Sequence, residues 1–194
     1  MNFLAHSYLS GNDNEIILGN MIGDFVKGKN HLHFKDKVKQ GIILHRDIDE
    51  YTDKHPIVKE AKKKLYKRYH HYSGVIVDIF YDHFLAKNWL LFSKIPLSNY
   101  AQYCYDILDR NSAIIPEKAN YAFHYMKEQN WLYNYQSIEG IGRALLGMSR
   151  RTTFESGLEN ATEELQEDYE FHNGNFMKFF PDVIEYSKIR LKSI

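Results

Sequence analysis

Apolar residues recur every three or four positions along most of this chain, which is the spacing of one face of an α-helix. In residues 14–27, for example, Ile16, Ile17, Met21 and Phe25 keep this spacing until Gly28 ends the helix. No run of β-branched residues alternates with polar residues between turn signals, as a half-buried strand would require. The pattern predicts an all-α protein, in which residues 1–194 form one compact multi-helix domain.

The predicted helices are separated by short segments of turn-forming residues. Thr52–Pro56 marks one break because the residue before a proline disfavours helix, and His172–Asn175 marks another. Gly19 and Gly23 lie four residues apart, so their helix face lacks side-chain bulk and permits a close approach by another helix. The expected helices cover residues 2–10, 14–27, 41–53, 57–71, 75–92, 99–110, 116–130, 137–148, 155–172 and 176–191.

Two of these helices carry acidic and imidazole groups among large apolar residues. Asp78 and Asp82 are four residues apart and share a helix face, with His83 one step around it. His45 and Asp49 share a face in the same way. A carboxylate on an apolar helix costs several kcal/mol unless it is paired, hydrogen-bonded or bound to a cation. The two helices therefore indicate a shared polar site.

The type of ligand points to a divalent metal ion. With His6 and Asp24 on the first two helices, the set offers carboxylates and imidazoles but no thiolate. These are ligands for hard cations such as Mn²⁺ and Mg²⁺ rather than for structural zinc. Such an ion polarises a phosphoryl oxygen and lowers the pKa of a coordinated water, which is the chemistry of phosphoester hydrolysis.

A structural alternative stands beside each of these interpretations. A lone histidine such as His6 is more often a satisfied core or rim residue, and Asp24 fits a hydrogen-bonding role near a helix end. His45 and Asp49 fit an ordinary ion pair. The like charges of Asp78 and Asp82 argue more strongly for a cation, because they repel unless something neutralises them. The remaining histidines lie in polar or loop contexts and are expected at the surface: His31, His33, His55, His70, His71, His124 and His172.

The charge balance and the single cysteine narrow the class of protein. The chain has 25 Lys and Arg against 25 Asp and Glu, so its net charge gives no argument for nucleic-acid binding. The single Cys104 excludes an intrachain disulfide framework and fits a reducing compartment. The N-terminus lacks the pattern of a signal peptide, and no apolar run reaches the roughly 18 residues of a membrane helix. We therefore expect a soluble, cytoplasmic protein that binds neither nucleic acid nor membrane.

One helix concentrates positive charge, while the compensating acidic residues lie mainly near the C-terminus. This basic helix, residues 59–71, fits either a solvated face or a docking surface for an acidic partner. Its basic residues are Lys59, Lys62, Lys63, Lys64, Lys67 and Arg68, followed by His70 and His71.

Four arginines are candidates for phosphate contacts because a guanidinium presents its donors as a fork. They are Arg46, Arg143, Arg150 and Arg151. The chain has no Walker-type glycine loop and no nucleophile elbow, and Cys104 has no evident base beside it. Nucleophilic serine or cysteine catalysis is therefore disfavoured.

Several of these segments together resemble the acyl carrier protein phosphodiesterase family. They are Met1–His6, Gly19–Gly28, Gly41–Asp49 with Thr52-Asp53, and Asp78–Leu85, followed more loosely by Trp131-Leu132 and Arg150-Arg151. The resemblance covers essentially the whole chain and implies an all-helical fold like that of the HD-domain phosphohydrolases. It also implies hydrolysis of the phosphodiester that joins 4′-phosphopantetheine to a serine of holo-acyl carrier protein, with Mn²⁺ as the cofactor.

The positions that match the family's motifs define the expected site. Asp24, His45, Asp82 and His83 are the expected metal ligands. His6, Asp49 and Arg46 are the expected catalytic residues, and holo-acyl carrier protein is expected to dock on the basic helix 59–71. The His-Asp dipeptide that gives HD proteins their name does not occur, and the reversed Asp82-His83 is the nearest feature.

Two alternatives to this function remain at the level of sequence. One is an HD-like phosphohydrolase that acts on a nucleotide or another small phosphoester and needs no docking surface. The other is a non-catalytic helical module that binds an acidic protein without any dependence on a metal.

Overall fold

The computed structural model describes residues 1–150, 152 and 155–194, and every regular element among them is a helix. The prediction of an all-α protein is therefore confirmed. The α-helices are α1 (Phe3–Leu9), α2 (Asn14–Met21), α3 (Asp36–Lys54), α4 (Pro56–Tyr69), α5 (Ser73–Lys87), α6 (Trp89–Phe92), α7 (Leu97–Arg110), α8 (Glu117–Glu128), α9 (Trp131–Asn134), α10 (Ile138–Ser149), α11 (Ala161–Glu167) and α12 (Tyr169–Leu191). Short 3₁₀ helices are η1 (Gly23–Phe25), η2 (Gly28–His33), η3 (His70–Tyr72) and η4 (Leu158–Asn160).

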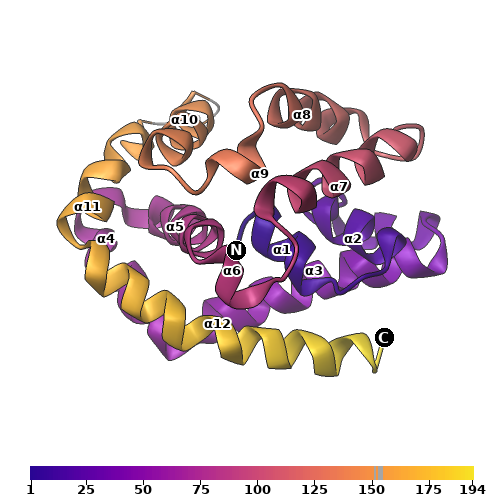
Figure 1. Ribbon diagram of the computed structural model, residues 1–194, viewed down its shortest axis with the longest axis horizontal. Helices are drawn as coiled ribbons and strands as arrows, with labels where there is room; N and C mark the ends of the chain where they lie inside the picture. The colour runs from indigo at the N-terminus through magenta and orange to yellow at the C-terminus, as the bar shows by residue number, and fades with distance from the viewer. Residues whose placement is uncertain (151, 153–154) are drawn as a thin grey trace.

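Helix α5 lies at the centre of this arrangement. It is buried on nearly all sides, which suits a sequence that is apolar around most of its circumference. Helices α1, α4, α10 and α12 pack against it. Figure 1 shows α12 running along one side of the molecule, with α8, α9 and α10 on the opposite side. The central helix therefore connects the two sides of the fold.

Glycines allow α2 and α3 to cross at very short range, as the spacing of Gly19 predicts. A Cβ atom on Gly19 would lie 2.0 Å from the carbonyl oxygen of Val38, and one on Gly41 would lie 2.3 Å from that of Ile16. Gly23 follows α2 rather than lying within it, and a Cβ there would lie 2.3 Å from the His45 ring. The crossing therefore brings η1 directly against α3.

The C-terminal helices differ from the prediction. Helix α12 runs unbroken through His172–Asn175, and the break falls at Asp168 instead. The preceding helix begins only at Ala161 rather than near residue 155. His172, Asn175 and Phe176 lie on the buried face of α12, so tertiary burial outweighs the turn preference of Asn-Gly-Asn. His172 is 0% exposed, which corrects its expected position at the surface.

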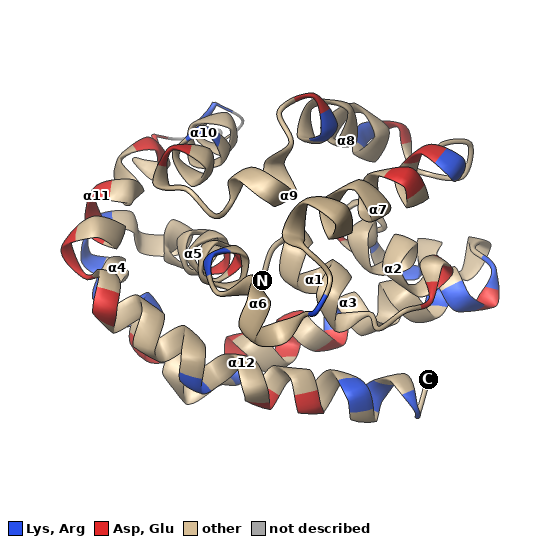
Figure 2. Ribbon diagram, in the orientation of Figure 1, with Lys and Arg blue, Asp and Glu red and all other residues tan. Residues whose placement is uncertain are grey.

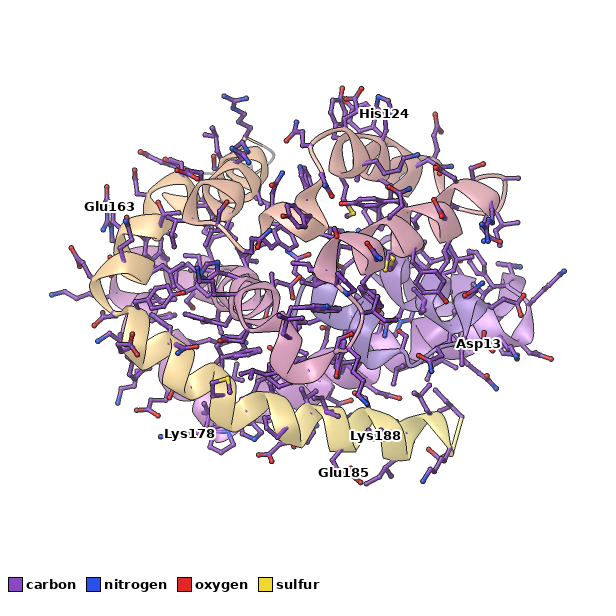
Figure 3. All side chains as sticks on the ribbon, viewed as in Figure 1. Asp13, His124, Glu163, Lys178, Glu185 and Lys188 are labelled. Atoms are coloured by element: carbon purple, nitrogen blue, oxygen red, sulfur yellow. The ribbon has the colours of Figure 1, made fainter. Side chains whose placement is uncertain are left out.

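Charged residues lie on the outward faces of the helices. Figure 2 shows basic and acidic residues interspersed along α12, and Figure 3 shows Lys178, Glu185 and Lys188 pointing away from the body of the molecule. Within the described ranges, no helix is both long and apolar enough to cross a membrane.

Candidate metal centre and its pocket

Four side chains from α1, η1 and α3 converge at one end of the α2–α3 crossing. His6 Nε2 lies 3.1 Å from Asp49 Oδ1, and His45 Nε2 lies 3.2 Å from both Asp49 Oδ2 and Asp24 Oδ1. The two imidazole rings stack with their centroids 4.0 Å apart. One ligand atom from each of His6, His45 and Asp49 lies within 4.8 Å of the others. We call these four residues the imidazole–carboxylate cluster.

Asn20 fixes the direction of both imidazoles. The Ser10 hydroxyl donates to the carbonyl of His6 at 2.8 Å, so it can only accept from the Asn20 amide nitrogen, 2.8 Å away. The Asn20 amide oxygen must then accept from His6 Nδ1 at 2.7 Å, while the Asn20 backbone carbonyl accepts from His45 Nδ1 at 2.8 Å. Both Nε2 atoms are therefore directed at the carboxylates, in the arrangement that metal-binding histidines use.

The charges in the cluster are strongly coupled. Burial and the neighbouring His45 lower the pKa of His6. Burial alone would lower the pKa of His45, but hydrogen bonds to Asp24 and Asp49 raise it to about 9. Burial opposes ionisation of Asp49, yet hydrogen bonds from His45 and His6 hold the pKa of its carboxyl well below the usual range. The hydrogen bond from His45 also lowers the pKa of Asp24.

This donor set fits a divalent cation. In their neutral forms, both Nε2 atoms and the carboxylate oxygens are acceptors facing one another, so the cluster needs positive charge between them. A proton on His45, whose pKa the two carboxylates raise, is one source of that charge. A divalent cation bound by His6, His45 and Asp49 would satisfy the same acceptors, and this ligand chemistry suits Mn²⁺.

The cluster opens into a pocket of about 400 Å³. Carboxylates from Asp24, Asp49, Asp53 and Asp78 line it, together with apolar side chains that include Trp131. Such a concentration of negative charge repels a phosphodiester unless cations compensate for it. The amino group of Met1, which lies 3.0 Å from Asp78 Oδ1 and 3.7 Å from Asp49 Oδ1, and Lys62, which pairs with Asp53, compensate part of this charge.

The family model described as acyl carrier protein phosphodiesterase matches residues 1–183. The chain belongs to this family. A curated relative from Photorhabdus laumondii, named acyl carrier protein phosphodiesterase, is 31% identical over 186 residues, which cover 95% of this chain and 94% of the relative.

Two further members of the family carry the same name. The relative from Pectobacterium atrosepticum and that from an Enterobacter species are each 30% identical over 189 residues, covering 97% of this chain and 98% of the relative. No solved structure matches the chain.

The structure places the expected ligand Asp82 away from the cluster, at the start of α1. Its Oδ2 accepts from the Leu4 backbone N–H at 2.8 Å, and its Oδ1 accepts from those of Ala5 at 3.2 Å and Asn2 at 3.3 Å. Burial raises the pKa of Asp82 to about 7, although these donors and the amino group of Met1 oppose the shift. Asp82 thus fixes the start of the helix that carries His6, in the manner of an N-terminal capping group.

The expected ligand His83 is also directed elsewhere. Its Nδ1 donates to the Tyr135 carbonyl at 2.8 Å, and its Nε2 accepts from the Tyr169 hydroxyl at 3.1 Å. Consecutive residues on a helix point about 100° apart, so Asp82 faces α1 while His83 faces α9 and α12. The structure therefore brings Asp24 and His45 together with His6 and Asp49, but not with Asp82 and His83.

Arg46, an expected catalytic residue, holds the backbone of the η1–η2 segment. Its guanidinium donates to the carbonyls of Val26 at 2.7 Å and Gly28 at 2.9 Å, and it is not among the residues that line the pocket. Among the other candidate phosphate contacts, Arg143 and Arg150 line a neighbouring hollow, and Arg151 lies outside the described residues.

Asn20 is a functional residue that the sequence interpretation missed. The sequence did contain an indication of this role: Asn20 lies among apolar residues, and a buried amide is costly unless both its polar atoms form hydrogen bonds.

Proposed function

We propose that this protein is a metal-dependent phosphodiesterase that releases 4′-phosphopantetheine from holo-acyl carrier protein and leaves the apo-protein. Membership of the family supports the substrate, since the relatives are named acyl carrier protein phosphodiesterases. The observation that carries the metal dependence is the pair of imidazole Nε2 atoms, each fixed through Nδ1, that meet the Asp49 carboxylate at the pocket.

His6, His45 and Asp49 would hold the ion, with Asp24 beside them. When bound, a cation such as Mn²⁺ polarises a phosphoryl oxygen and lowers the pKa of water at the site. Asn20 keeps both imidazoles aligned, and the ion would offset negative charge that the carboxylates place at the pocket. In the reaction, the oxygen of water bonds to phosphorus while the bond from phosphorus to the serine oxygen breaks. The serine oxygen takes up a proton and leaves with the apo-protein.

The docking surface in this proposal is the outer face of α4. Lys62 pairs with Asp53, which lines the pocket, so this face begins beside the proposed site of reaction. Lys59, Lys63 and Lys67 are exposed and have no ion-pair partner within the described part of the chain. A partner with acidic helices would find unpaired positive charge here.

The remaining cations of the basic helix are already engaged. Lys64 pairs with Asp168 at 2.9 Å, and Arg68 pairs with Glu163 at 3.0 Å and Glu164 at 2.9 Å. These contacts tie α4 to the C-terminal helices, so we narrow the proposed docking surface to Lys59, Lys63 and Lys67.

The reaction is tested by mass spectrometry of holo-acyl carrier protein after incubation with the protein and Mn²⁺, with EDTA in a parallel sample. We expect loss of the phosphopantetheine mass only in the presence of metal. Retention of that mass with Mn²⁺, Mg²⁺ and other divalent cations would refute the proposal. Activity on a small phosphodiester under the same conditions would then favour the phosphohydrolase alternative.

The docking surface is tested by charge reversal. The double variant Lys63→Glu/Lys67→Glu should raise the KM for holo-acyl carrier protein about tenfold or more at low salt, with kcat nearly unchanged. The matched control is Lys178→Glu/Lys188→Glu, which alters net charge equally on the outer face of α12. An equal effect of the two double variants would show that only net charge matters, and would remove α4 from the proposal.

A further inference from the structure

A second hollow adjoins the pocket of the imidazole–carboxylate cluster. It lies between α8 and α10 and has a volume of about 440 Å³, and Ala122 and Trp131 line both hollows. Figure 1 shows α8 and α10 apart on the same side of the molecule, with α9 between them. We call this hollow the α8–α10 groove. Because the two hollows share walls, a ligand whose reacting group lies at the cluster can continue into the groove.

The walls of the groove are aromatic and apolar with cationic groups along one side. Tyr121 and Tyr125 project from one face of α8, while Arg143 and Leu146 project from one face of α10. Tyr121 is 68% exposed and Leu146 is 39% exposed, so neither side chain is there to fill the core. Arg143 has no ion-pair partner in the described part of the chain, which leaves its donors available to a ligand.

This chemistry fits a slender, uncharged chain that contains amides. The aromatic rings and Leu146 can pack against methyl and methylene groups, and the guanidinium of Arg143 can donate to amide carbonyls. The volume is typical of a small-molecule site. The groove therefore fits the arm of the substrate in size and chemistry.

We propose that the α8–α10 groove binds the pantetheine part of the substrate, with Trp131 at the junction where the arm leaves the phosphate. This inference rests on the proposed function, because that function places the phosphodiester at the cluster. It assigns Trp131, Arg143 and Leu146 to recognition of the arm, while Lys59, Lys63 and Lys67 remain the docking surface for the protein.

A larger side chain at Gly147 offers a way to narrow the groove. It lies on the wall of the groove in α10, and a Cβ atom built there has no described atom within 4 Å. The variant Gly147→Leu therefore adds bulk to the groove while replacing a glycine in a helix with a better helix former. Gly174 in α12 is equally open, so Gly174→Leu makes the same chemical change away from the groove.

The experiment titrates free pantetheine into the protein and follows tryptophan fluorescence. Trp89 is buried in the core, so a change in signal reports on Trp131, and Trp131→Phe should abolish it. We expect wild-type protein and Gly174→Leu to bind pantetheine alike, and Gly147→Leu to bind it about tenfold more weakly or worse. In hydrolysis of holo-acyl carrier protein, Gly147→Leu should raise KM.

The outcomes separate this inference from the proposed function. Pantetheine carries no phosphate and needs no metal, so its binding is measured whether or not the protein hydrolyses holo-acyl carrier protein. Undetectable binding to the wild type, or unchanged binding to Gly147→Leu, would overturn the inference even if hydrolysis is confirmed. A raised KM for holo-acyl carrier protein with unchanged pantetheine binding would also overturn it, because the groove would then receive the protein surface.

Discussion

The imidazole–carboxylate cluster and the Asp82-His83 pair are built from the same two residue types, Asp and His. They differ in the exposure of their carboxylates to solvent. In the cluster, Asp49 is half-buried at a pocket and faces two imidazoles whose free nitrogens converge on it. In the pair, Asp82 and His83 are buried, and each is satisfied by protein groups on a different side of α5.

This difference shows that burial of a polar side chain does not identify its function. The carboxylate of Asp82 accepts from three backbone N–H groups of the α1 N-terminus and lies away from the cluster. The cluster holds an excess of acceptors that only a proton or a metal ion can satisfy. The convergence of two imidazole Nε2 atoms and the carboxylates at a pocket, rather than the presence of Asp and His, therefore separates the candidate reaction site from the scaffold.

The largest effect is expected from removal of the Asp49 carboxylate, which contacts both imidazoles of the cluster. Asp49→Ala should reduce hydrolysis about 10³-fold or more and weaken Mn²⁺ binding by at least about tenfold, because it removes a ligand and the partner of His6 and His45. Initial rates and calorimetric titration measure the two effects. Asp53→Ala, at the same pocket but outside the cluster, is the control. Wild-type rates in Asp49→Ala would exclude the cluster as the site.

Asp82→Asn should act on stability instead. The substitution replaces one carboxylate oxygen, which accepts from backbone N–H groups of α1, by an NH2 group that cannot accept. The free energy of unfolding should therefore fall by roughly 3 kcal/mol. Urea denaturation measures this, with the exposed Lys87→Gln as the control on the same helix. A variant that keeps wild-type stability but loses Mn²⁺ binding would place Asp82 among the ligands.

His172 sharpens the contrast with His83, because neither of its ring nitrogens has a hydrogen-bond partner within the described residues. Burial lowers the pKa of His172 to about 4, with nearby Asp168 opposing and Lys64 reinforcing that effect. Between pH 6.5 and 4 the unfolded chain therefore binds a proton that the folded protein excludes. Stability is fully present above pH 6.5 and should fall by up to about 3 kcal/mol as the pH drops to 4.

The measurement is urea denaturation at pH 7 and pH 5 for the wild type and His172→Phe. The variant has no titrating group at this position, so its stability should decline less over this interval. An identical decline in both proteins would show that other groups govern acid sensitivity.

The smallest effect is expected for Tyr169→Phe. This change removes the hydroxyl that donates to His83 Nε2 and should cost about 1 kcal/mol of stability without changing kcat. Thermal unfolding and initial rates together test it. A large loss of activity at unchanged stability would show that His83 acts at the reaction site after all.

Spacing along the chain predicted part of the site well. His45 and Asp49 share a helix face because they are four residues apart, and the structure confirms that they meet. For Asp82 and His83, the helical spacing predicts only that consecutive side chains point about 100° apart on α5. It could not say which helices each would face, because that depends on the packing of α1, α9 and α12 around α5.

Residues whose partners are backbone groups were the hardest to assign from the sequence. Arg46 was expected at the phosphate, but it donates to the carbonyls of Val26 and Gly28. Asn20 was overlooked, although its carbonyl and amide orient both imidazoles. No pattern in the sequence marks which carbonyls a fold leaves unpaired. The unbroken α12 has a similar cause, since burial of Phe176 outweighs the local preference of Asn-Gly-Asn.

The capping of α1 by Asp82 has a consequence for the order of events during synthesis on the ribosome. Helix α1 has seven residues, which is too short to persist alone in water. The backbone N–H groups of Asn2, Leu4 and Ala5 find their acceptor in α5, more than seventy residues later in the chain. His6 leaves the ribosome among the first residues but reaches its final position only after α5 has emerged and folded. A nascent chain of about fifty to ninety residues would therefore carry all four residues of the cluster before α1 is held in place.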